Sequence, residues 1–85
     1  MPMIYLSTEH QTHLTSWQLA VLLPKLGLED ALQGEIPVRF LHVVEQKLDI
    51  YLNQPYPLVD AQVLNEVLRL TRKAAQCSLP LHWSR

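Results

Sequence analysis

The stretch that decides the fold class is residues 58–76, which read LVDAQVLNEVLRLTRKAAQ. Its apolar side chains recur every three or four residues, which places them on one stripe of an α-helix. The members of that stripe are Val59, Val63, Val67, Leu70, Ala74 and Cys77, with Leu64 and Leu68 beside them. Basic residues near its end suit the negative pole of a helix dipole. The pattern predicts a helix over residues 58–76.

The segment before this helix, residues 53–57 (NQPYP), is a break, because each proline disfavours helical backbone at the residue before it. Further upstream, Pro37 suits the first position of a helix, where its missing N–H costs no hydrogen bond. We therefore predict a second helix over residues 37–52. Its apolar residues cover more than one face: Leu41, Val44, Leu48 and Tyr51 on one stripe, and Val38, Phe40, Val43 and Ile50 outside it. A helix so widely apolar is central to its core or shared between two subunits.

Two capping boxes compete for the start of the first helix. Thr8 with Gln11 and Thr15 with Gln18 both have the required spacing, and we favour one helix over residues 9–23. Pro24 then ends or kinks this helix, and Gly27 suits its C-terminal cap. Residues 28–33 fit a short helical turn before the second helix.

Both ends of the chain have the pattern of extended segments. Residues 1–6 (MPMIYL) are apolar and compatible with a strand, and residues 79–85 (LPLHWSR) alternate apolar and polar side chains. These arms can pair as a minor two-stranded ribbon, within one subunit or between two. The fold class that we predict is mainly α, with three helices and two extended arms in a single domain over residues 1–85.

The composition is more apolar than usual for a chain of 85 residues, which is enough for one core. Hydrophobic residues make up 48% and charged residues 18%, whereas an ordinary domain has about 25% charged residues. The net charge of −1 argues against nucleic acid and anionic membranes as partners. The chain has neither a membrane-spanning run nor a signal-peptide pattern, and its single cysteine excludes an intrachain disulfide. We expect a soluble cytoplasmic protein.

Residues that carry chemistry are few. His10 and His13 lie three apart on the predicted first helix, beside Glu9, so metal binding through these two histidines is one alternative. Cys77 has His82 near it in the sequence, but its place on the apolar stripe favours a small buried hydrophobe over a nucleophile. With two glycines there is no phosphate-binding loop. We expect no enzymatic activity and no cofactor.

The apolar excess favours a function in protein–protein contact. We predict a small non-catalytic adaptor or regulator that is a homodimer and has a protein partner of unknown identity. Its predicted interface anchors are Trp17, Tyr51, Tyr56 and Trp83, with Arg69 and Arg72 at the rim. The main alternative is a nucleic-acid-associated regulator that uses the basic end of the third helix.

Overall fold

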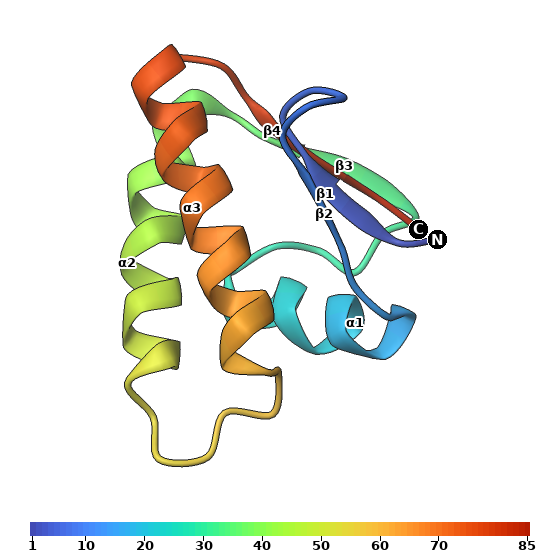
Figure 1. Ribbon diagram of the computed structural model, residues 1–85, viewed down its shortest axis with the longest axis vertical. Helices are drawn as coiled ribbons and strands as arrows, with labels where there is room; N and C mark the ends of the chain where they lie inside the picture. Colours follow the sequence, from blue (N-terminus) through green and yellow to red (C-terminus); the bar gives the residue numbers. More distant parts are fainter.

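The computed structural model describes residues 1–85 and combines three α-helices with a four-stranded antiparallel sheet (Figure 1). Its elements in chain order are β1 (Met3–Tyr5), β2 (Gln11–His13), α1 (Ser16–Lys25), β3 (Gln33–Ile36), a 3₁₀ turn (Val38–Phe40), α2 (Leu41–Leu52), α3 (Ala61–Cys77) and β4 (Leu81–Ser84). The prediction of a mainly α domain with a minor ribbon is therefore wrong, and the fold is α+β. None of the helices is long and apolar enough to cross a membrane.

The sheet has the strand order β2-β1-β4-β3. The two terminal arms pair within one chain, with Ile4 opposite Trp83, and they form the middle of the sheet. Two further strands, β2 and β3, extend it on either side. These strands read QTH and QGEI, which are too short and too polar to show a period of two, so periodicity did not reveal them.

The first helix begins later than we predicted for residues 9–23. Thr15 is its N-cap: the backbone N–H of Gln18 donates to Thr15 Oγ1 at 3.0 Å, and Thr15 N–H donates to Gln18 Oε1 at 2.9 Å. The second capping box is thus the one that forms, while Gln11–His13 pairs with β1 as a strand. The helix continues through Pro24, and Gly27 follows it at φ +77°. The helical turn predicted for residues 28–33 is absent, and β3 begins at Gln33.

The choice between the two capping boxes predicts different costs for two threonine substitutions. Thr15→Ala removes the side-chain acceptor at the start of α1 and should lower the free energy of unfolding by about 1 kcal/mol. Thr8→Ala, in the exposed turn between β1 and β2, should leave it unchanged. Urea denaturation of both variants checks this, and a larger loss for Thr8→Ala would contradict the observed helix start.

The second and third helices lie close to their predicted ranges. α2 follows a 3₁₀ turn rather than starting at Pro37, and Asp60 caps α3 by accepting from Gln62 N–H at 2.8 Å. The two helices run antiparallel side by side (Figure 1). Cys77 is exposed at the end of α3, so its predicted place in the core is wrong. The reason is that the chain turns back at Ser78, whose φ is +54°, and the helix stops there.

The helices lie on one side of the sheet (Figure 1), and both the helices and the strands contribute residues to the core. The sheet contributes alternate residues to it, as expected for antiparallel strands with one covered face. The fully buried large side chains are Ile4, Leu19, Leu22, Leu23, Leu41, Leu48, Leu64, Leu70, Leu81, Val44, Val59 and Val67. Polar residues on the strands therefore point to the opposite, open face.

Trp83 packs across Gly34, its direct neighbour in the sheet. A Cβ atom added to Gly34 would stand 2.2 Å from Trp83 Cη2, so no larger residue fits there. The indole N–H also donates to the carbonyl of Ala31 at 3.4 Å. The last strand, β4, thus contacts both β3 and the loop that precedes β3.

Gly34→Ala should destabilise the protein by about 2 kcal/mol or more, because the new methyl group overlaps the indole ring. Gln33→Ala, at an exposed neighbouring position, is the control and should be nearly neutral. In a Trp83→Leu background the added cost of Gly34→Ala should shrink, which a double-mutant cycle of unfolding free energies measures. An equal cost in both backgrounds would show that the indole is not the cause.

Candidate functional site

Two of the four aromatic residues predicted as interface anchors are buried within the chain. The Tyr51 hydroxyl accepts a hydrogen bond from Leu58 N–H at 3.1 Å, and the Lys25 ammonium lies 5.6 Å from the Tyr51 ring centre. Trp83 is buried over Gly34. Both side chains hold the fold together, and neither presents a large area to a partner.

The other two aromatic residues, Trp17 and Tyr56, are exposed. Trp17 lies in the first turn of α1, and Tyr56 lies in the loop between α2 and α3. Neither lines a hollow in the surface. Their role as interface anchors stays a prediction.

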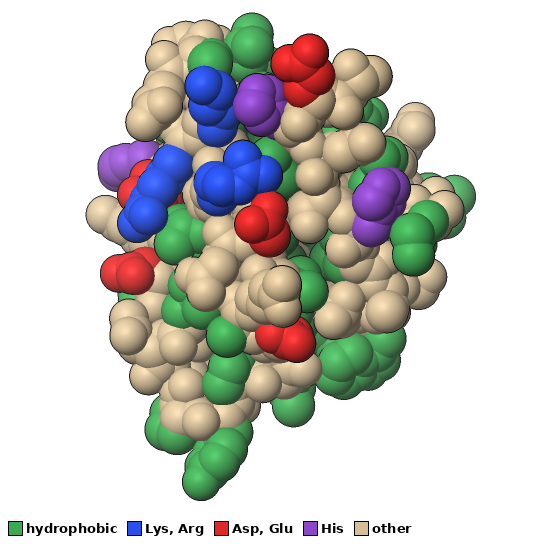
Figure 2. Space-filling view, in the orientation of Figure 1, with side chains coloured by type: hydrophobic (Ala, Val, Ile, Leu, Met, Phe, Trp, Pro, Cys, Tyr) green, Lys and Arg blue, Asp and Glu red, His purple; other side chains and the backbone are tan.

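The basic end of α3 carries ion pairs. Arg69 Nη2 lies 3.1 Å from Glu66 Oε2, and Arg72 Nε lies 3.1 Å from Glu45 Oε1. Figure 2 shows the Lys and Arg side chains of this face gathered among acidic ones. Each pair is half-exposed and contributes little stability, but it offsets positive charge that a polyanion would use. Nucleic-acid binding by this end stays a prediction, and the two arginines in ion pairs leave less positive charge there for a polyanion.

The two histidines of the metal alternative do not lie on a helix. His10 lies in the turn between β1 and β2, where its carbonyl accepts from Leu6 N–H at 2.8 Å, and His13 lies on β2. The helical spacing that we expected to place both imidazoles on one side is therefore wrong. No three or more His, Cys, Asp and Glu side chains are grouped to hold a metal ion.

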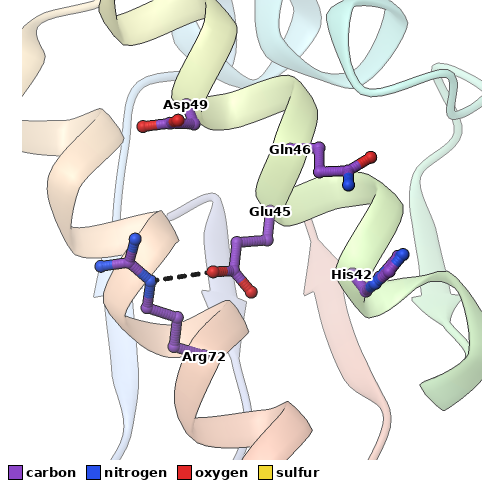
Figure 3. Close-up of a pocket in the computed structure, with 5 residues that line it drawn as sticks. All are labelled: His42, Glu45, Gln46, Asp49 and Arg72. Atoms are coloured by element: carbon purple, nitrogen blue, oxygen red, sulfur yellow. Dashed lines mark hydrogen bonds and ion pairs between the residues drawn. The ribbon is translucent and has the colours of Figure 1, made fainter.

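A polar hollow of about 210 Å³ lies between α2 and α3, lined by His42, Glu45, Gln46, Asp49 and Arg72. In Figure 3, Glu45 and Arg72 point toward each other across the two helices, and His42 and Gln46 point away from Arg72. Glu45 is thus paired with the Arg72 guanidinium, whose Nε lies 3.1 Å from Glu45 Oε1. The arrangement links two helix surfaces.

The open face of the sheet carries a row of polar side chains across three strands. The rings of Tyr5 and His82 stack with centroids 5.3 Å apart, and His82 Nδ1 lies 3.9 Å from Glu35 Oε2. A shallow hollow of about 380 Å³ beside them is lined by Tyr5, Gln33, Gly34, Glu35, His82 and Trp83. Tyr5, His82 and Glu35 thus form one polar group on this face.

The apolar surface lies along α2. We define the α2 strip as Phe40, which is the N-cap of α2, together with Val43, Lys47 and Ile50 on the helix itself. These residues follow one another at helical spacing beside the buried stripe of α2. Phe40 is 47% exposed and Ile50 is 65% exposed. The predicted wide apolar arc of this helix is thus half buried against the core and half open.

Two hollows adjoin the α2 strip and meet at Lys47. The first, of about 240 Å³, is lined mainly by apolar side chains: Leu26, Gly27, Leu28, Phe40, Val43, Val44 and Lys47. The second, of about 230 Å³, is lined by Lys25, Lys47, Ile50, Tyr51 and Gln54. Both lie between α2 and the C-terminal end of α1, with the Lys47 side chain between them, and we call the two hollows and the α2 strip together the α2 groove.

The α2 groove was missed as a site in the sequence, although its signal was present. The wide apolar arc of residues 37–52 indicated a helix with more than one contact face. The interface anchors were instead predicted from large aromatic side chains, which selected Tyr51 on this helix, and Tyr51 is buried. Only the packing of α2 against α3, with the turn after α1 at its margin, distinguishes the covered half of the arc from the open half.

No protein-family model, curated protein or solved structure matches this chain.

Proposed function

We propose that this protein is a small non-catalytic interaction module that binds a partner protein in the α2 groove. The observation that carries the proposal is the half-exposed α2 strip beside an apolar hollow. Helix-in-groove docking uses such a surface, in which apolar side chains of a partner enter pockets beside a helix. The module acts in the cytoplasm, where a free, exposed thiol such as Cys77 stays reduced.

The energetic argument rests on the large side chains that solvent now contacts. Fully burying a side chain of the size of Phe or Ile contributes about 1.5–3 kcal/mol. Phe40 and Ile50 are 47% and 65% exposed, so covering both side chains contributes roughly half of the value for burying two such residues fully, or about 1.5–3 kcal/mol. Val43 and Leu28, which are partly exposed, add to this value. Interfaces owe most of their affinity to a few such central residues.

A displayed library of random peptides, selected on the immobilised protein, tests this function. We expect enriched peptides that lose binding to Ile50→Glu, because the charge places a carboxylate inside the apolar contact. Leu58→Glu is the matched control, since Leu58 is 63% exposed and lies outside the groove. Selected peptides that bind Ile50→Glu and the parent protein equally, or no enrichment at all, would contradict the proposal.

The homodimer is a separate prediction about the same protein. Molar mass measured over a concentration series from micromolar to millimolar tests it, with Ile50→Glu and Leu58→Glu in parallel. A dimer lost only in Ile50→Glu would make the second copy the partner at this groove. A monomer at every concentration would refute the homodimer and leave binding of another protein in place.

A further inference from the structure

We infer that the α2 groove takes an amphipathic helix that carries carboxylates beside its apolar anchors. This inference rests on the proposed function, because it names the kind of partner that the same groove binds. It goes further in assigning charge, length and secondary structure to that partner. Each of the three is argued from the side chains that line the groove.

The charge follows from cations that take part in no ion pair of this chain. Lys25 and Lys47 line the groove, and the Arg39 guanidinium lies 5.5 Å from the ring centre of Phe40 at one end of it. None of the three takes part in an ion pair. By contrast, Arg69, Arg72 and Arg85 are each paired with a carboxylate of this chain. No Asp or Glu lines either hollow of the groove, so carboxylates have to come from the partner.

The position of Lys47 makes its charge central to the groove. It lines both hollows, and its Cε and Nζ atoms lie 3.9 Å from where a Cβ atom on Gly27 would stand. Its stem therefore covers the turn after α1, while its ammonium borders the apolar surface. A charge that a partner partly desolvates discriminates strongly between an acidic and a basic partner.

The length of the groove fits a helix. α2 (Leu41–Leu52) is about 18 Å long at 1.5 Å per residue, which is a little over three turns, and Phe40 and Gln54 lie just beyond its two ends. The three cations are spread from one end of this span to the other, so a short loop cannot neutralise all of them. A helix with apolar residues at three- and four-residue spacing meets both hollows with one face and places acidic residues on either side.

A second copy of this chain fits the groove less well. If two α2 strips packed antiparallel about a two-fold axis, Lys47 of each copy would lie near that axis and face the same residue of the other. Like charges brought together at an interface cost affinity. The acidic segment next to the groove, Glu29-Asp30, is two residues long, and Asp30 is already paired with Arg85.

The test uses two designed peptides of about 16 residues, the length that spans the groove as a helix. One carries Leu and Phe anchors at helical spacing with Glu beside them, and the other has Lys at every Glu position. Fluorescence anisotropy at low and high salt measures binding to the parent protein and to three variants. These are Lys25→Glu/Lys47→Glu, Ile50→Glu and the control Lys73→Glu, which changes an unpaired lysine on α3.

The parent protein should bind the acidic peptide at least about tenfold more tightly than the basic one, with the difference shrinking at high salt. Lys25→Glu/Lys47→Glu should reverse this preference. Lys73→Glu should leave it unchanged, and Ile50→Glu should weaken both peptides. Circular dichroism shows whether each variant keeps its helices, so a loss of binding is separated from a loss of folding.

The contrary outcomes distinguish failure of the acidic-helix inference from failure of the proposed interaction function. Equal binding of both peptides, abolished by Ile50→Glu, would overturn the acidic partner and keep the interaction module. If the protein self-associates and Lys25→Glu/Lys47→Glu abolishes this, the occupant of the groove is a second copy rather than a helix of another protein. If the protein binds anionic lipid vesicles and neither peptide, the occupant is a membrane surface. If neither peptide binds, the inference fails, and the library selection alone decides the proposed function.

Discussion

The rest of the structure depends on one contact, the Trp83 indole packed against Gly34. It joins the last strand of the chain to a strand formed midway along it, and the indole N–H reaches the loop carbonyl of Ala31. Because β4 lies between β1 and β3, this contact orders the sheet from its centre. The helices then have one apolar face to cover, and the other face stays polar.

That arrangement also decides which side of α2 is left open. α2 packs against α3 and buries Leu41, Val44, Leu48 and Tyr51. The turn after α1 reaches only the margin of the neighbouring apolar side chains. With three helices on a small sheet, no element remains to cover the α2 strip. The same geometry that completes the core thus creates the surface on which the proposed function rests.

The basic residues around the α2 groove differ from the arginines elsewhere in their ion pairing. The arginines on α3 and at the C-terminus each pair with a carboxylate of this chain, so Lys73 is the one cation of α3 outside an ion pair. Around the α2 groove, Lys25, Arg39 and Lys47 have no such partners. An apolar surface bordered by unmatched cations selects its partner by charge as well as by shape.

The sequence by itself determined that the second and third helices exist, with ends within four residues of the observed Leu41–Leu52 and Ala61–Cys77. It also determined the break between them and the wide apolar arc of α2, because helical periodicity and proline are local signals. It offered Thr8 and Thr15 as candidate caps and favoured a helix over residues 9–23, which starts after Thr8, although Thr15 is the cap that forms. Only the tertiary structure decided between them, since Gln11–His13 became a strand by pairing with β1. It alone also placed β3, buried Tyr51 and Trp83, and left the α2 strip exposed. Strand pairing and the coverage of a helix face depend on residues distant in the chain, which no local pattern reports.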